Sequence, residues 1–268
     1  MKENPIGIFD SGIGGLTVAH AVNKILPQER IVYFGDTAHL PYGDKSTAAI
    51  QSYAIKICDV LLKNNCKVIL IACNSASAAA YQLVKEYVGS RAKVMNVIDP
   101  AVKYISKKYE GKTVGLIGTK KTVQSNVYRK RLDKNSKQIE LKALATPLLV
   151  PMIEEGFFNN KITQSIIENY LSDETLQGIE ALILGCTHYP LIKKEIELYY
   201  KNSVEVIDSS EIVAASLKAY LSKNDLLSSN SKEVKHSFYV SDYTRSFAET
   251  TRIFFKEEVK LEHYPLWE

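Results

Sequence analysis

Two segments of the chain share one design, an apolar run that ends at a cysteine. Residues 69–72 (Ile-Leu-Ile-Ala) lead to Cys73, and residues 181–185 (Ala-Leu-Ile-Leu-Gly) lead to Cys186. In open α/β sheets, a residue that closes a strand and opens a helix faces the crevice in which ligands bind. A single cysteine at such a place is more often a small buried hydrophobe. The repeated pattern instead predicts a two-sided active site with one thiol on each side.

Polar residues follow each cysteine, Asn74 and Ser75 after the first and Thr187 after the second. We expect them to cap the helices that follow, because Asn, Ser and Thr side chains accept hydrogen bonds from the free amides of a helix N-terminus. The same amides and the helix dipole attract anions. This setting favours a thiolate or a substrate carboxylate.

Short apolar runs alternate with helix-like stretches along the chain, a rhythm typical of α/β proteins with largely parallel sheets. The expected strands form two series, at residues 6–9, 31–34, 68–72 and 94–98 and then at residues 114–117, 139–143, 181–184 and 204–207. The expected helices between them cover residues 46–64, 75–88, 123–132, 163–171 and 191–200.

Each series closes with Val-Ile-Asp, at residues 97–99 and 206–208, which indicates a structural repeat. The remaining chain is too short for a domain of its own: a helix at 211–221, a loop at 222–235, a strand at 238–240 and a helix at 244–255. We expect this tail to return and complete the first half. The sequence therefore predicts two similar domains, each a mainly parallel sheet flanked by helices, with the active site in the cleft between them. The first domain is residues 1–98 with 209–268, and the second is residues 99–208.

Composition narrows the class of protein. The chain has 268 residues, 46% of them hydrophobic, which is enough for a substantial core, and it has no run of 18 apolar residues. Residues 1–5 lead directly into the first expected strand without a signal-peptide apolar region, so we expect a cytoplasmic protein with no membrane partner.

The four cysteines show no C-x-x-C spacing, which disfavours a metal site and a disulfide framework. The net charge of +4 is small for a nucleic-acid-binding protein, and the basic stretch 120–142 is interpreted as a solvated helical face.

Residues 6–17 form an expected strand that runs into a glycine-rich turn and a helix. A dinucleotide-binding fingerprint would need glycine where Thr17 stands, and Asp10 places a carboxylate where a pyrophosphate would approach. Asp36, at the end of the next strand, keeps a nicotinamide-dependent oxidoreductase open as an alternative. We favour a compact pocket for an anion or an amine.

Two titratable residues accompany the thiols. Asp10 ends a strand in the same half as Cys73, where it is suited to accept a proton, orient a thiol or hold an ammonium group, as well as to cap a tight turn. His188 lies two positions after Cys186 and is suited to poise that thiol, because an imidazolium beside sulfur lowers the pKa of a thiol.

Two further segments add candidates. Residues 147–156 place two prolines and a glycine around Glu154, which indicates a rigid loop whose carboxylate is suited to pair with His188. The turn at residues 40–44 offers the phenol of Tyr42 and, at Gly43, a backbone that a ligand can approach closely, although an ordinary surface turn has the same composition.

Together these groups predict reversible removal of a proton from carbon without a cofactor. The hydrogen between an amino group and a carboxylate is weakly acidic, so donors must surround the developing carbanion. A single base would return the proton to the face that it left. Two thiols on opposite faces allow thiolate abstraction on one side and thiol donation on the other, which inverts the centre.

Motifs spread over nearly the whole chain resemble those of the cofactor-independent aspartate/glutamate racemase family. They are Gly-Ile-Phe-Asp-Ser-Gly-Ile-Gly-Gly at 7–15, Pro-Tyr-Gly at 41–43, Ala-Cys-Asn-Ser-Ala at 72–76, Leu-Val-Pro at 149–151 with Glu-Glu-Gly at 154–156, and Gly-Cys-Thr-His-Tyr-Pro at 185–190. The resemblance implies racemisation of glutamate, with no cofactor, by a homodimer that supplies D-glutamate for peptidoglycan. It implies that Cys73 and Cys186 are the catalytic thiols, assisted by Asp10, Glu154 and His188. It also implies that substrate is bound by Asp10, Ser11, Tyr42, Gly43, Asn74, Ser75, Thr119, Thr187 and His188.

The chain departs from the family pattern at Ser75, where threonine is usual; the hydroxyl is kept and a methyl group is lost, so we expect substrate binding to survive. Three alternatives stay open: a racemase of aspartate or another amino acid, the nicotinamide-dependent oxidoreductase, and a non-catalytic protein that binds a small acid between two similar domains.

Overall fold

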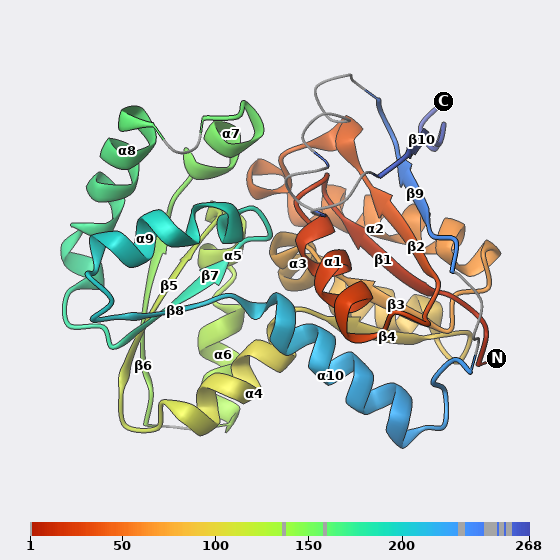
Figure 1. Cartoon of the computed structure of the whole chain (residues 1–268), viewed down its shortest axis with the longest axis horizontal. Coiled ribbons are helices and arrows are strands. Elements are labelled where there is room, and N and C mark those ends of the chain that lie inside the picture. The colour runs from red at the N-terminus through yellow and green to blue at the C-terminus, as the bar shows by residue number, and fades with distance from the viewer. Residues whose placement is uncertain are drawn as a thin grey trace.

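The computed structural model describes residues 2–135, 138–157, 160–229, 234–243, 251, 255 and 259–268. It contains two β-sheets, and every strand pair in the described residues is parallel. Helices flank both sheets (Figure 1). The α/β class with two mainly parallel sheets is therefore confirmed.

The first sheet has six strands in the order β10-β9-β2-β1-β3-β4. Its strands are β1 (Ile6–Asp10), β2 (Ile31–Gly35), β3 (Val68–Ile71), β4 (Lys93–Asn96), β9 (Ser237–Val240) and β10 (Leu261–His263). Successive side chains of a strand point to opposite faces, so Ile8 joins one core and Phe9 the other. Helices α2 (Thr47–Lys63) and α3 (Asn74–Val88) pack on the Phe9 face, and α1 (Leu16–Ile25) and α10 (Ser209–Lys223) pack on the Ile8 face.

The second sheet has four strands in the order β6-β5-β7-β8. They are β5 (Thr113–Gly118), β6 (Glu140–Ala145), β7 (Ala181–Gly185) and β8 (Glu205–Ile207). Its helices are α4 (Ile98–Lys108), α5 (Lys120–Gln124), α6 (Val127–Asn135), α7 (Leu149–Glu154), α8 (Lys161–Leu171) and α9 (Lys193–Tyr199). Short 3-10 turns complete the described elements: η1 (Thr37–His39), η2 (Tyr42–Asp44), η3 (Glu174–Leu176) and η4 (Tyr189–Ile192).

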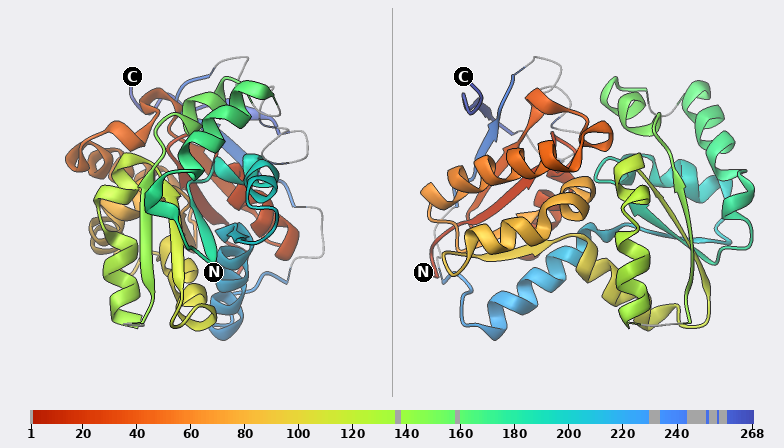
Figure 2. Two further views of the ribbon diagram at one scale, coloured as in Figure 1. Left: turned by 90° about the vertical axis from the view of Figure 1, so that its left-hand side faces the viewer. Right: turned by 180° about the vertical axis from the view of Figure 1, so that it is seen from behind.

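One hydrophobic core joins the two sheets. The cluster that contains Ile8 and Leu70 of the first sheet also contains Leu116 and Ile183 of the second. Helices α4 and α10 contact each other and lie along the junction of the two halves (Figures 1 and 2). Strands of the first sheet come from both ends of the chain, as expected, but the domain boundaries at 98/99 and 208/209 stay a prediction.

Three local expectations were wrong. The strand expected to reach residue 98 ends at Asn96, because its Oδ1 accepts hydrogen bonds from the backbone of Ile98 and Asp99 and so starts α4. The segment expected to be a rigid loop at 147–156 contains α7. The helix expected at 123–132 is divided between α5 and α6 at Asn126, whose φ is +54°.

The caps of the two site helices also differ from the expectation. Cys73 itself is the N-cap of α3, because its sulfur accepts a hydrogen bond from the backbone of Ala76. After Cys186 a 3-10 turn follows rather than an α-helix, and its N-cap is His188, which makes no capping hydrogen bond.

The helix expected at residues 244–255 lies mostly outside the described residues; Thr251 and Phe255, which are described, are helical. Among the described helices none is both long and apolar enough to cross a membrane.

Candidate active site

Neighbouring strands of each sheet end at the same edge and place the candidate residues there. Asp10 ends β1, and Cys73 follows β3 beside it; Thr119 and Cys186 follow the paired strands β5 and β7. Both sheets contribute to one narrow pocket, with a cavity of about 20 Å³. Its lining consists of Ser11, Leu40, Pro41, Tyr42, Gly43, Cys73, Asn74, Ser75, Thr119, Val150, Gly185, Cys186, Thr187 and His188.

The pocket gathers all the predicted site residues except Asp10 and Glu154, and both of these bond to residues that line it. Four lining residues were not singled out from the sequence: Leu40, Pro41, Val150 and Gly185. Each of the four lies next to, or within a few positions of, a predicted site residue. The motifs that contain the predicted residues were therefore the only sequence signal for these four.

Cys73 lies in a buried environment at the start of α3. Its sulfur accepts the Ala76 amide at 3.4 Å and lies 3.7 Å from the Ser11 hydroxyl. Burial raises the pKa of the Cys73 thiol well above its usual range, and the nearby Asp10 raises that pKa further. Cys73 therefore keeps its proton at neutral pH in the free protein.

Asp10 is fully buried under the glycine-rich turn. Its Oδ2 accepts the backbone amides of Gly12 at 3.2 Å and Gly15 at 2.9 Å, and the hydroxyl of Thr187 donates to Oδ1 at 3.4 Å. Burial raises the pKa of Asp10, and the positive charge of His188 and the backbone amides oppose that rise only in part. Asp10 thus caps the turn and at the same time connects the two sheets through Thr187.

Cys186 and His188 form a pair on the second side of the pocket. The sulfur lies 3.7 Å from Nδ1 of His188, and Nε2 of His188 lies 2.8 Å from Oε1 of Glu154. Burial alone would lower the pKa of His188, but its hydrogen bonds with Cys186 and Glu154 outweigh burial and raise it well above its usual value. His188 is therefore an imidazolium at neutral pH, and a positive charge this close to sulfur stabilises a thiolate.

The glycine-rich turn packs directly on this pair. A Cβ atom at Gly14 would lie 2.4 Å from Cε1 of His188, so the turn can approach the imidazole only because residue 14 has no side chain. The hydroxyl of Thr17 donates to the backbone oxygen of Thr187 at 3.1 Å, which holds the turn against the Cys186 loop. The turn therefore belongs to the two-thiol pocket.

Asp36 does not fit the ribose-binding role of a nicotinamide site. Its carboxylate is fully buried and accepts hydrogen bonds from Tyr42 at 2.6 Å, Ser241 at 2.7 Å and the indole of Trp267 at 2.8 Å. Its hydrogen-bonding capacity is used to hold Tyr42, a pocket residue. This geometry disfavours the oxidoreductase alternative.

Hydroxyl and amide groups bridge the two halves beside the thiols. Ser75 and Thr119 share a hydrogen bond of 2.8 Å between their hydroxyls. Tyr128 of α6 reaches Oδ1 of Asn74 at 2.8 Å. The residues that follow Cys73 are thus fixed by the second sheet and its helices.

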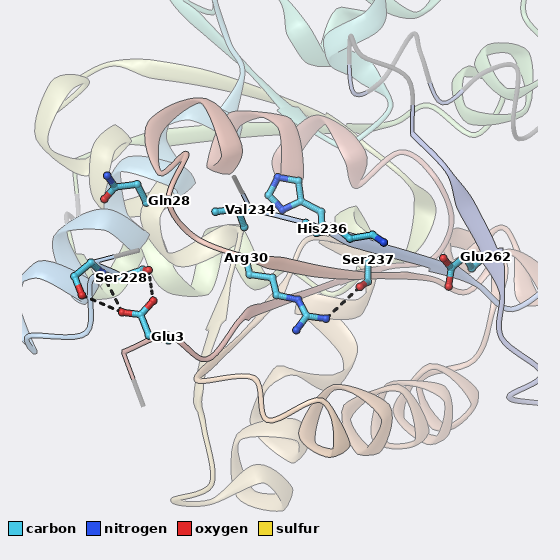
Figure 3. A pocket seen from close by; sticks show the side chains of 10 residues that line it. Glu3, Gln28, Arg30, Ser228, Val234, His236, Ser237 and Glu262 are labelled. Carbon is cyan, nitrogen blue, oxygen red and sulfur yellow. Dashed lines mark hydrogen bonds between the residues drawn. The ribbon is translucent and has the colours of Figure 1, made fainter. Parts of the chain in front are cut away.

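A larger hollow of about 750 Å³, whose lining includes neither Cys73 nor Cys186, lies beside β9 (Figure 3). The carboxylate of Glu3 there is already bonded to Ser228 and Ser229, and Arg30 is directed to the hydroxyl of Ser237 (Figure 3). In the described part of the chain, no group of three or more His, Cys, Asp or Glu side chains is placed to hold a metal ion.

Comparison with known proteins gives the class of this chain. A family model described as Asp/Glu/Hydantoin racemase matches residues 16–217. The chain belongs to this family, which confirms the resemblance predicted from the motifs.

Three similar proteins are glutamate racemases. Glutamate racemase of Chlorobaculum parvum is 41% identical over 256 residues, which cover 96% of this chain and 94% of that protein. The crystal structure of glutamate racemase from Francisella tularensis in complex with D-glutamate has a TM-score of 0.93 and 39% identity, covering 100% of this chain and 99% of that one. Glutamate racemase isoform RacE1 from Bacillus anthracis has a TM-score of 0.93 and 31% identity, with 98% of each chain covered.

Proposed function

We propose that this protein is a cofactor-independent glutamate racemase that interconverts L- and D-glutamate. The observation that carries the proposal is the single pocket lined by Cys73 and Cys186, one from each sheet. The relatives described above support glutamate as the substrate, and one of them was solved with D-glutamate bound.

The two thiols divide the reaction between them. The Cys186 thiolate, beside the His188 imidazolium, takes the α-proton from one face of glutamate: the Cα–H bond breaks and an S–H bond forms. The Cys73 thiol gives its proton to the opposite face, so its S–H bond breaks and a new Cα–H bond forms. In the reverse reaction the roles exchange.

Polar groups around the thiols stabilise the intermediate carbanion. Donors already fixed in the free protein need no reorganisation as negative charge develops on the substrate carboxylate. We assign this binding role to Ser11, Tyr42, Gly43, Asn74, Ser75, Thr119, Thr187 and His188. Asp10 assists by placing a carboxylate next to Cys73, and Glu154 assists by placing a carboxylate next to His188.

The remaining expectations belong to the same proposal. We infer that the enzyme works as a homodimer in the cytoplasm and supplies D-glutamate for peptidoglycan, as the family resemblance implies. We also infer that residues 1–98 with 209–268 and residues 99–208 act as the two domains that enclose the pocket.

The test uses the purified protein in deuterated buffer without added cofactor. L-glutamate, D-glutamate and L-aspartate are followed separately by circular dichroism and by loss of the α-proton NMR signal. We expect both glutamate enantiomers to converge on a racemic, deuterated mixture while aspartate stays inert. Faster turnover of aspartate than of glutamate would contradict the assignment of glutamate as the substrate. No change with any of the three amino acids would contradict the proposed racemase activity.

Cysteine variants test the mechanism. We expect Cys73→Ala and Cys186→Ala to lose racemisation by at least about 10³-fold, because a single base returns the proton to the face that it left. Cys73→Ala keeps the base that we assign to Cys186, so slow exchange of deuterium into one enantiomer is expected for that variant. Cys58→Ala is the matched control, since Cys58 is equally buried but lies outside the pocket. Full racemisation by either pocket variant would contradict the two-thiol mechanism.

A further inference from the structure

Tyr128 is the second residue of α6, on the side of the second sheet, and it is buried with 1% of its surface exposed. Its hydroxyl lies 2.8 Å from Oδ1 of Asn74, the first residue of α3 on the side of the first sheet. Tyr128 itself does not line the pocket, whereas Asn74 does. Tyr128 therefore contacts a pocket residue from outside the pocket.

The direction of this hydrogen bond can be derived. Burial raises the pKa of Tyr128, with a further contribution from Cys186, so its hydroxyl is protonated. Among the residues that the structure describes, Asn74 is the only hydrogen-bond partner of that hydroxyl. A buried hydroxyl without an acceptor is costly, so Tyr128 donates and the side-chain oxygen of Asn74 accepts.

This bond decides which end of the Asn74 amide is left for the pocket. The two ends of an asparagine amide are nearly equal in shape, and only their partners distinguish them. With Oδ1 held by Tyr128, the NH2 group keeps its two donors, and it has no partner among the described residues. A turned amide would present a carbonyl oxygen, which repels a carboxylate.

We propose that Tyr128 is a positioning residue, which holds Asn74 so that its NH2 group donates to a carboxylate of the bound amino acid. This role rests on the proposed racemase function. Since Tyr128 belongs to α6 and Asn74 to α3, the donor is oriented only when the two halves of the molecule are packed together. The neighbouring bond between Ser75 and Thr119 joins the halves at the same place.

The test removes the hydroxyl oxygen of Tyr128 by substitution with phenylalanine. Tyr128→Phe keeps the ring in place and removes the donor, so presenting the NH2 group to substrate would leave Oδ1 buried without a partner. We expect KM for both glutamate enantiomers to rise about five- to tenfold, with kcat reduced less than about threefold. Tyr189→Phe is the matched control: Tyr189 is also fully buried, its hydroxyl bonds to Thr146 at 2.7 Å, and it lies outside the pocket. Its KM should stay within about twofold of wild type.

A double-mutant cycle separates positioning from a general effect on packing. In an Asn74→Ala background, Tyr128→Phe should change KM by less than about twofold, because the residue through which it acts is gone. Equal effects of Tyr128→Phe in both backgrounds would overturn the proposal, as would an unchanged KM in the single variant. A wild-type protein inactive on glutamate would overturn the proposed function and this role with it. An active wild type with an unaffected variant would overturn the role of Tyr128 alone.

Discussion

The Glu154–His188 contact gives a quantitative prediction for Glu154→Gln. Oε1 of Glu154 lies 2.8 Å from Nε2 of His188, and the two side chains are 17% and 2% exposed. Glutamine keeps an oxygen that accepts the imidazole N–H but removes the negative charge. An exposed ion pair contributes up to about 1 kcal/mol and this pair is largely buried, so without the negative charge the imidazolium loses about 1–1.5 kcal/mol. At about 1.4 kcal/mol per pKa unit, the pKa of His188 should fall by about one unit.

The sign of the effect on activity follows from the role of His188. The imidazolium is the form that stabilises a thiolate at Cys186, and it is lost as pH rises. Lowering the pKa of His188 therefore moves the alkaline limb of the rate profile to lower pH by about one unit. We assign that limb to His188, since burial raises the pKa of Cys73 well above its usual range.

The assay is the pH dependence of kcat/KM, followed by circular dichroism from either enantiomer. Because racemisation has an equilibrium constant of one, kcat/KM must fall equally in both directions. Glu155→Gln is the matched control, since Glu155 is the exposed neighbour of Glu154 at the end of α7. An alkaline limb that stays in place in Glu154→Gln, or moves equally in Glu155→Gln, would refute the assignment of His188 and Glu154.

Two further predictions concern packing. Gly14→Ala places a Cβ atom 2.4 Å from Cε1 of His188, so the imidazole must move away from the thiol; kcat should fall about 100-fold while the far-ultraviolet circular dichroism stays unchanged, and near-normal activity would contradict this geometry. Lys67 and Glu29 form an ion pair of 2.6 Å with both side chains buried, so Lys67→Met should lower the free energy of unfolding in urea by about 3–5 kcal/mol. Glu29→Gln in the same chain should recover part of that loss, and full stability of the single variant would argue against a buried pair.

The sequence was most informative where function depends on strand ends. The apolar runs of β3 and β7 are buried along their whole length, and each stops at a polar stretch that lies at the edge of its sheet. A residue placed there takes its position at the sheet edge from the strand that it follows. That is why the thiols and their neighbours could be predicted together from short motifs.

Local composition misled the prediction at α7. Pro147, Pro151 and Gly156 indicated a loop, but Pro151 is the third residue of α7, where its missing N–H removes no hydrogen bond of the helix. Four apolar residues of α7 are buried, which stabilises the helix through packing. The tertiary contacts thus outweighed the signal of the prolines, and the same helix brings Glu154 to His188.

Apart from the Glu154–His188 pair, the contacts between distant residues around the pocket were not predicted. The indole of Trp267 donates to Asp36, which in turn holds Tyr42 at the pocket, yet these residues are far apart in the sequence. Nothing in the periodicity near residue 267 indicates such a partner. The Tyr128–Asn74 bond is of the same kind, since it depends on how α6 packs against α3.

The repeated strand–cysteine design gives two similar thiols, and the surroundings then make them different. Burial and the nearby Asp10 keep the proton on Cys73, while the imidazolium of His188 lies 3.7 Å from Cys186 and stabilises a thiolate. A reaction that removes a proton on one face and returns one on the other needs one acid and one base at its start. Two thiols would offer no base to take the α-proton, and two thiolates could take it but would have no proton to return to the opposite face. In the proposed mechanism, the asymmetry of Asp10 and His188 around a symmetric pair of strand ends therefore sets which thiol starts as the base and which as the acid.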